Sequence, residues 1–238
     1  MNNINFNEDD SIVFDIDTDP HEENNPLYSS RQHIIYPGVT VLVGANGAGK
    51  TTLINNMVSI LRDNNIRYLT YSEVLDGRDA ARSKYGFEDN MSALAETLMS
   101  SEGENIYFNF GNFVTKLGRY ITNYDKGEIA FSLSVDDTAI DTIPVGNKMV
   151  SADTYRFIFI DAIDSGMSID KIVSVCDFFD KVLIKPNKNL KIYLVLSTNQ
   201  YEFCRAFPDS CYGVRECDYI TFKDYEDYRN YICNYNEK

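Results

Sequence analysis

The chain has 238 residues, of which 44% are hydrophobic, and its formal net charge is −14. This length suits one α/β domain with a sizeable core, and no apolar run approaches the roughly 20 residues of a membrane-spanning helix. A general binder of phosphate backbones carries a dense basic face, so the acidic balance argues against direct nucleic-acid binding. Residues 1–10 are rich in Asn and acidic side chains, unlike a secretion signal, and we expect a cytoplasmic protein without membrane insertion.

The predicted elements begin with a strand at 10–17, where apolar and polar residues alternate. A polar loop at 18–31 and a short strand at 34–35 follow. Residues 39–43, VTVLV, are apolar and β-branched, which is typical of a buried parallel strand. Residues 51–64 carry apolar side chains at helical spacing, so an amphipathic helix is expected there.

Between this strand and this helix the chain reads GANGAGKTT, which matches G-x-x-x-x-G-K-[ST] at every fixed position. Glycines allow successive backbone N–H groups to point at one cluster of phosphate oxygens. Lys50 can reach the β and γ phosphates, and the Thr51 hydroxyl can hold Mg²⁺. The sequence therefore predicts a nucleotide-binding loop of nine residues: Gly44, Ala45, Asn46, Gly47, Ala48, Gly49, Lys50, Thr51 and Thr52.

The middle of the chain is predicted to be a strand at 66–71 followed by a mostly helical region at 72–122. The next strand, EIAFSLSV at 128–135, alternates apolar and polar residues, and we expect it to pair with residues 142–145 or nearby residues. This β-hairpin, within 123–155, looks like an insertion. Its acidic side chains make it the candidate surface for an unknown protein partner: Asp136, Asp137 and Asp141.

The last third is predicted to hold core strands at 156–161 and 191–196, a helix at 169–179 between them, and a short strand at 219–222. A final helix at 224–235 carries four tyrosines at helical spacing, which is typical of a helix packed on the edge of a sheet. The strand RFIFID ends in Asp161. A site that binds a nucleoside triphosphate needs such a carboxylate to organise Mg²⁺, so Thr51 and Asp161 are the predicted metal residues.

The sequence assigns no function to the cysteines or to the lysines between 181 and 191. The cysteines are odd in number and form no C-x-x-C pair, which indicates reduced thiols. The spacing of Cys204, Cys211 and Cys217 fits no zinc pattern, so a metal site there is only a minor alternative. The lysines between 181 and 191 are expected to be a solvated region beside a strand rather than a binding patch.

The stretch FIFIDAIDSG resembles the soluble ATP-binding cassette (ABC) ATPases of the SMC/RecF kind and their small phage-encoded relatives. In those proteins an apolar strand ends in Asp, and a Ser-Gly turn follows a few residues later, as Ser165 and Gly166 do here. The resemblance implies an α/β P-loop NTPase fold, a three-layer sandwich with a mostly parallel central sheet, in one domain over residues 1–238. It also implies ATP and Mg²⁺ as cofactors, homodimerisation on ATP binding, and residence in the host cytoplasm if a phage encodes the chain.

This sequence departs from the family at two catalytic positions. The family places Glu directly after the strand Asp to polarise water, and Ala162 stands there instead. Asp164 could substitute for that Glu, although a turn-capping role is the favoured alternative. The family's switch residue is usually His, whereas this chain has Thr198 and Asn199, of which neither relays a proton as imidazole does. Asp164 and Asn199 are the candidate catalytic residues, and hydrolysis is expected to be slow or absent.

Two further parts of an ABC site have candidates in this chain. The family's signature turn contacts the γ-phosphate of a partner copy, and Ser101 and Gly103 in SEGE are the best match. Ser101 reads equally well as a helix N-cap. Adenine stacks on an aromatic residue upstream of the glycine loop in related proteins, and the sequence does not choose among His21, Tyr28 and Tyr36.

The sequence is therefore compatible with three functions. The first is a soluble ATPase whose dimer is closed by ATP and released by slow or partner-stimulated hydrolysis. The second is a pseudo-ATPase that binds nucleotide and acts as a protein-binding module, which Ala162 and Asn199 favour. The third is a P-loop kinase of nucleotides or polynucleotides, which the pattern from Asp161 to Gly166 disfavours.

Overall fold

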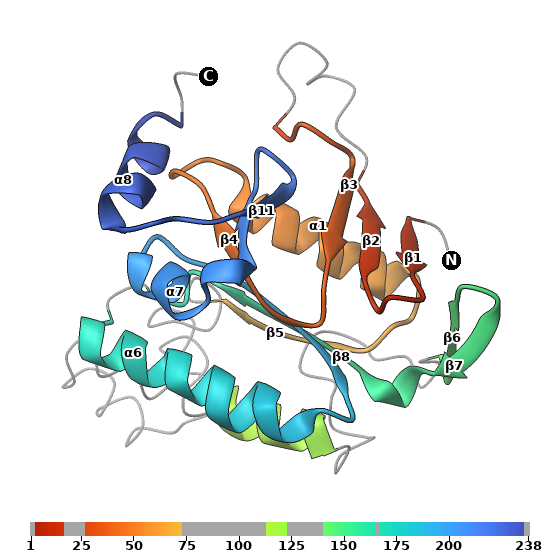
Figure 1. Cartoon of the computed structure of the whole chain (residues 1–238). Helices are drawn as coiled ribbons and strands as arrows, with labels where there is room; N and C mark the ends of the chain where they lie inside the picture. Colours follow the sequence, from red (N-terminus) through yellow and green to blue (C-terminus); the bar gives the residue numbers. More distant parts are fainter. Residues whose placement is uncertain (1–2, 17–26, 73–112, 123–139, 165–166, 236–238) are drawn as a thin grey trace, which may run out of the picture.

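The computed structural model describes residues 3–16, 27–72, 113–122, 140–164 and 167–235, which form two mixed β-sheets and five α-helices (Figure 1). The fold class is α/β, as predicted. No helix within these ranges is long and apolar enough to cross a membrane.

The larger sheet contains six strands of the described chain: β4 Gly38–Val43, β5 Tyr68–Ser72, β8 Tyr155–Asp161, β9 Lys191–Ser197, β10 Cys211–Gly213 and β11 Asp218–Ile220. Their order across the sheet is β11-β10-β4-β9-β8-β5. The five strands from β10 to β5 run parallel to their neighbours, and β11 lies antiparallel to β10 at one edge. The predicted mostly parallel central sheet is present.

Both faces of this sheet are covered, which explains why its strands are apolar at nearly every position. All seven residues of β8 are buried. Because successive side chains of a strand point to opposite faces, Ile158 and Ile160 join one hydrophobic cluster, whereas Phe157 and Phe159 join another on the opposite face.

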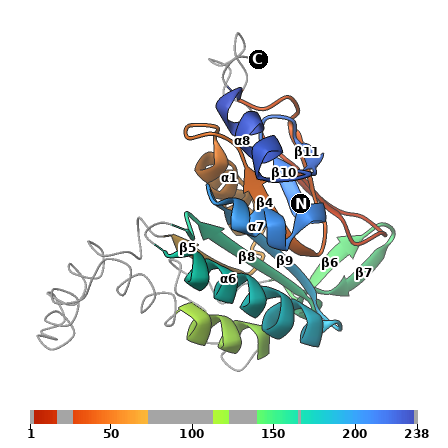
Figure 2. The same cartoon turned by 60° about the vertical axis from the view of Figure 1, so that its left-hand side comes forward.

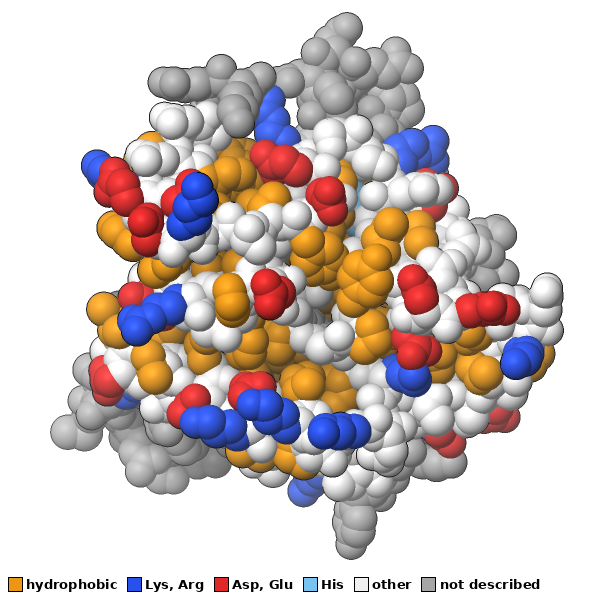
Figure 3. All heavy atoms as spheres, viewed as in Figure 1, with side chains coloured by type: hydrophobic (Ala, Val, Ile, Leu, Met, Phe, Trp, Pro, Cys, Tyr) orange, Lys and Arg blue, Asp and Glu red, His pale blue; other side chains and the backbone are white. Residues whose placement is uncertain are grey.

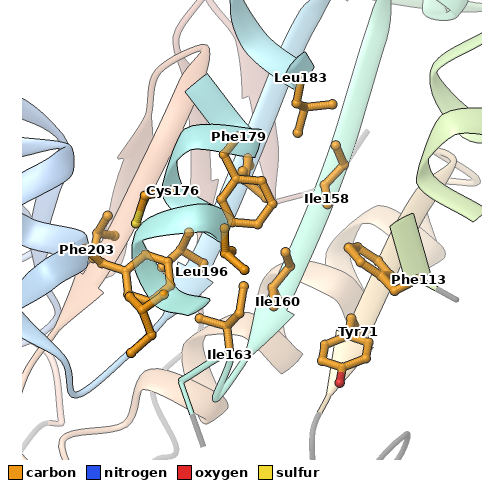
Figure 4. Close-up of a cluster of buried hydrophobic side chains, with 14 of the residues drawn as sticks. Tyr71, Phe113, Ile158, Ile160, Ile163, Cys176, Phe179, Leu183, Leu196 and Phe203 are labelled. Carbon is orange, nitrogen blue, oxygen red and sulfur yellow. The ribbon is translucent and has the colours of Figure 1, made fainter. Parts of the chain in front are cut away.

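Helices cover the first of these faces. They are α6 Ile169–Phe178, α7 Tyr201–Ala206 and the helical residues 113–122. Figure 4 shows Phe179 and Leu183 lying over Ile158, with Phe113 next to Tyr71. After α6 the chain continues as a π-helix, η3 Phe179–Ile184, and two short 3₁₀ segments complete this region: η4 Lys185–Asn187 and η5 Pro208–Ser210.

The opposite face is covered jointly by helix α1, Lys50–Asp63, and a second sheet of five described strands. These strands are β1 Ile4–Phe6, β2 Ile12–Asp15, β3 Gln32–Ile35, β6 Thr142–Val145 and β7 Lys148–Ser151, in the order β3-β2-β1-β6-β7. One outer layer thus combines a helix with a β-sheet, a mixed layer that the sequence did not predict. The alternating apolar residues of β1 and β2 pack into the same cluster as α1.

The structure describes part of the predicted hairpin region. Residues 142–145 pair with Lys148–Ser151 through the two-residue turn Gly146-Asn147. Gly146 has a φ of 53°, the left-handed conformation that tight hairpin turns require. The expected strand at 128–135 lies outside the described residues. Since β6 also pairs with β1, the hairpin extends the second sheet and is not a separate projection.

The chain ends in helix α8, Tyr225–Cys233, close to the predicted 224–235. Figures 1 and 2 place α8 near β10, β11 and α7. A short 3₁₀ segment, η2 Ala152–Thr154, leads into β8. Four elements were not predicted: β1, β7, α7 and β10. Each has three to six residues, which is too short for a periodic pattern of side chains to stand out.

Candidate functional site

The carboxyl ends of β4, β8 and β9 meet at one edge of the central sheet. The chain leaves β4 toward α1 on one face, and it leaves β9 toward α7 on the other face. Adjacent parallel strands whose connections go to opposite faces create a crevice, which is where α/β proteins bind ligands. A pocket of about 390 Å³ lies there, lined by Leu27, Asn46, Gly47, Ala48, Gly49, Lys50, Thr51, Thr52, Asp161, Ala162, Asp164, Ser197, Thr198 and Asn199.

The glycine loop, residues 44–52, depends on its glycines in two ways. Gly47 and Gly49 have φ angles of 82° and 88°, a conformation that side chains with a β-carbon rarely adopt. Gly44 is required for close approach, because a β-carbon there would lie 2.8 Å from the Ala48 β-carbon. The Tyr28 hydroxyl donates to the Gly49 carbonyl at 3.1 Å, which fixes the end of the loop to the segment before β3.

Helix α1 begins at the pocket without the usual side-chain partner for its first N–H groups. Its N-cap is Gly49, no side chain accepts from its first turn, and that turn contains no acidic residue. Helix α8 shows the contrasting arrangement, in which Asp224 accepts from the Asp227 N–H at 2.9 Å. The first turn of α1 therefore presents backbone donors and the positive end of the helix dipole to the pocket, an arrangement suited to an anion.

Lys50 lies over the glycine loop. Its ammonium donates to the Gly44 carbonyl at 2.5 Å, to the Ala45 carbonyl at 3.2 Å and to the Asn199 side-chain oxygen at 2.9 Å. Burial lowers the pKa of Lys50, while the charges of Asp164 and Asp161 oppose this shift. The ammonium is thus held by neutral oxygens, which a phosphate oxygen could replace with a stronger charge-assisted bond.

A cluster of oxygen atoms lies beside Lys50. The Thr51 hydroxyl is 3.0 Å from both carboxylate oxygens of Asp161. Ser197 donates to Asp161 Oδ1 at 2.5 Å and accepts from the Ala162 N–H at 2.8 Å. Oxygen ligands of this kind suit Mg²⁺, which typically uses one or two protein carboxylates and takes its other ligands from phosphates and water. Among the described residues, no three His, Cys, Asp or Glu side chains gather as a separate metal site.

Asp164 is buried and holds two loops together. Its Oδ2 accepts from the Asn199 N–H at 2.8 Å, and its carbonyl accepts from the Met167 N–H at 3.2 Å. The carboxylate therefore bridges to the loop after β9, and only the backbone carbonyl of Asp164 takes part in its own turn. Ala162 lies between Asp161 and this turn, with a left-handed φ of 53°, and its methyl group lines the pocket.

The structure thus brings together most of the predicted site residues. Gly44 and Ala45 do not line the pocket, but their carbonyls hold Lys50. Ser101 and Gly103 lie outside the described residues. The sequence reasoning missed Leu27 and Ser197, although Ser197 ends a core strand at the same sheet edge as Asp161, which was a usable signal.

Neither described candidate for adenine stacking faces the pocket. Tyr28 is buried, with its ring against His33 at a centroid distance of 5.0 Å. Tyr36 is 46% exposed but stands beside Tyr219, with ring centroids 5.6 Å apart. His21 lies outside the described residues. Among the described residues upstream of the glycine loop, Leu27 lines the pocket.

Three of the four lysines at 181–191 are paired with carboxylates. Lys181 contacts Asp177 at 2.8 Å and Lys185 contacts Asp180 at 2.5 Å, and Lys191 pairs with Asp10. Blue and red side chains accordingly lie next to each other along the lower edge of the face in Figure 3, over α6 and η3. This pairing agrees with the expectation of a solvated region rather than a binding patch.

No protein-family model matches the sequence, and no curated protein matches it significantly. The geometry of the pocket is therefore the basis for a functional proposal.

Proposed function

We propose that this chain binds MgATP in the pocket at the carboxyl ends of β4, β8 and β9, and that it acts as an ATP-dependent switch with slow or absent hydrolysis. One observation carries the proposal. The glycine loop, an uncapped start of α1, Lys50 and the Thr51–Asp161 pair all border the same pocket. Each suits a different part of a magnesium-bound triphosphate.

Each group has a distinct role in the proposal. The loop N–H groups and the first turn of α1 bind phosphate oxygens, and Lys50 exchanges its carbonyl partners for the β and γ phosphates. Thr51 and Asp161 would hold Mg²⁺, directly or through water. The metal ion supplies neutralisation of the phosphate charge when it is bound.

Slow turnover follows from the groups next to the expected γ-phosphate. Ala162 has no group that accepts a proton from water. Asp164 already accepts the Asn199 N–H, so a catalytic role would require this bond to break. Asn199 contacts Lys50 through its side-chain oxygen and is placed to sense the phosphate that Lys50 binds.

The switch would work through a second copy of the chain. By resemblance to ABC ATPases, two chains would close over two ATP molecules, with Ser101 and Gly103 of each copy contacting the nucleotide of the other. Hydrolysis, spontaneous or stimulated by a partner, would then release the dimer. The open pocket edge formed by Asn46, Gly47 and Asn199, all in contact with solvent, is compatible with such a cover.

A pseudo-ATPase that uses nucleotide only to hold a protein-binding conformation is the second candidate. The observation that favours it is the engagement of Asp164 with the Asn199 N–H, which leaves the pocket with Ala162 where a catalytic carboxylate is needed.

Two measurements test the proposal. Phosphate release is measured for wild type, Lys50→Ala and Asp164→Ala, and the expected wild-type rate is below about 1 per second, the lower end of typical enzymes. Loss of turnover in both variants assigns Asp164 a catalytic role, whereas binding with no turnover selects the pseudo-ATPase. Sedimentation with and without MgATP tests the dimer, and an unchanged monomer would exclude it. Transfer of phosphate to an added nucleoside would point to a kinase instead.

A further inference from the structure

The tyrosines of helix α8 lie against the loops that build the pocket. Tyr225, Tyr228 and Tyr231 share one side of the helix at helical spacing, and Tyr235 follows in the turn after the last helical residue, Cys233. Together they contact several elements, and Tyr225 and Tyr228 share Tyr201 of α7 as a ring partner. Tyr225 packs edge-on against Tyr201 of α7 with ring centroids 5.6 Å apart, and Tyr231 donates to the Glu216 carboxylate at 2.7 Å. The remaining two reach the two sides of the proposed nucleotide site.

Tyr228 contacts the loop that follows β9. Its hydroxyl donates to the Asn199 carbonyl at 2.9 Å, and its ring is buried. Burial raises the pKa of Tyr228, so the hydroxyl remains a donor throughout the physiological range. Asn199 therefore links α8 to the pocket, because its carbonyl accepts from Tyr228 and its side-chain oxygen accepts from Lys50.

Tyr235 contacts the glycine loop. It is only 8% exposed and forms a small hydrophobic cluster with Ala45 and Ala48. Its hydroxyl oxygen would be 3.2 Å from a β-carbon at Gly44, so ring and loop are in close contact. Among the described residues the buried hydroxyl has no hydrogen-bond partner of normal geometry, so packing is the main contribution of this side chain.

The end of α8 is fixed to the sheet independently of the loop. Arg215, in the turn between β10 and β11, donates to the Tyr235 carbonyl at 2.7 Å, and its guanidinium lies 5.9 Å from the centre of the Tyr235 ring. Together with the Tyr231–Glu216 bond, this contact anchors α8 at the edge of the sheet. This anchored C-terminal segment therefore touches Asn199 on one side and the glycine loop on the other.

We propose that α8 is a positioning element that sets the glycine loop and Asn199 for nucleotide, so that nucleotide binding and the docking of α8 stabilise each other. This inference rests on the proposed function. Coupling between two sites is reciprocal, so a variant that loosens α8 must weaken nucleotide binding, and bound nucleotide must tighten α8. A partner that pulled α8 away would release the nucleotide in the same manner.

Four single variants test this coupling. Tyr235→Ala removes the packing on Ala45 and Ala48, whereas Tyr235→Phe keeps the ring and deletes only the unpartnered hydroxyl. Tyr228→Phe deletes the hydrogen bond to Asn199. Tyr225→Phe is the matched control, since Tyr225 is 58% exposed and contacts only α7 in the described hydrogen bonds and ring pairs.

Two readouts are taken on the full chain. Calorimetry gives the affinity for MgATP, and hydrogen exchange without nucleotide gives the protection of the amides at 44–49. We expect Tyr235→Ala to weaken binding at least about tenfold and to speed exchange of these amides, with Tyr235→Phe close to wild type. Tyr228→Phe should weaken MgATP binding by about threefold to tenfold, which corresponds to the net free energy of one hydrogen bond. Thermal unfolding checks that each variant is folded.

The outcomes separate the two proposals. If wild type does not bind MgATP, the proposed function fails, and the role of α8 toward nucleotide fails with it. If wild type binds and Tyr235→Ala binds equally well with unchanged exchange at 44–49, the proposed function survives and the role of α8 is overturned. Weakened binding in Tyr225→Phe equal to that in Tyr228→Phe would also overturn it, because the effect would not depend on contact with the site.

Discussion

Replacement of Gly44 by alanine tests the close packing of the glycine loop. The new β-carbon would lie 2.8 Å from the Ala48 β-carbon and 3.2 Å from the Tyr235 hydroxyl oxygen. The Ala48 β-carbon is attached to the backbone and cannot rotate away, so the loop must shift. Overpacking of this kind costs about 1–3 kcal/mol, and we expect that loss in the free energy of unfolding, measured by urea denaturation.

Two control variants make this prediction specific. Gly118 lies in the helix at 113–122 with open space around it, so Gly118→Ala should stabilise the protein by about 0.5–1 kcal/mol. The double variant Gly44→Ala/Ala48→Gly removes the obstructing methyl group and should recover most of the loss. If Gly44→Ala unfolds within about 0.5 kcal/mol of wild type, the ordinary range for neutral surface changes, the described loop packing is wrong.

Three further predictions concern metal, turn and pH. Thr51→Ser should keep the magnesium dependence of ATP binding, and Thr51→Val should lose it, as titrations with and without EDTA would show. Asp164→Ala should reduce the free energy of unfolding by about 1.5–3 kcal/mol, because the bond from Asn199 to a carboxylate is lost, while Asp164→Asn keeps an acceptor and should lose less. His33 is wholly buried, and burial lowers its pKa to about 4. Because the unfolded chain takes up this proton near pH 6.5, stability is complete above that pH and should fall by about 2 kcal/mol between pH 7 and pH 5. A His33→Gln variant that shows the same fall in chemical denaturation would refute this assignment.

Most of the central sheet and the helices α1, α6 and α8 could be predicted from the sequence because their side-chain periodicity is strong. The strands ending at Val43 and Asp161 are continuously apolar, and α1 has a clear buried face. Two strands of the second sheet, β1 and β7, and the assembly of the sheet were missed, because these strands have three or four residues and the sheet joins distant segments, as β1 does with β6. Nothing in the local sequence records such a pairing.

Some residues of the candidate site could also be predicted from the sequence, whereas others could not. Motif spacing located Lys50, Thr51 and Asp161, because their chemistry depends on position along the chain. The roles of Ser197 and Tyr28 as supports depend on contacts 36 and 21 residues away in the sequence, which only the fold creates. The contact of Tyr235 also depends on the fold. The tyrosines near the end of the chain were expected to pack on the sheet edge, and Tyr235 lies against the glycine loop as well.

The most direct test of the central claim is the affinity for MgATP of three proteins, measured by calorimetry. They are wild type, Lys50→Ala and Lys188→Ala, in which the last is a charge-matched control at an exposed lysine outside the pocket. We predict that wild type and Lys188→Ala bind equally and that Lys50→Ala binds about 10–100-fold more weakly, the loss of a charge-assisted bond to phosphate. Equal affinity in all three proteins, or no binding by wild type, would contradict the assignment of this pocket to ATP.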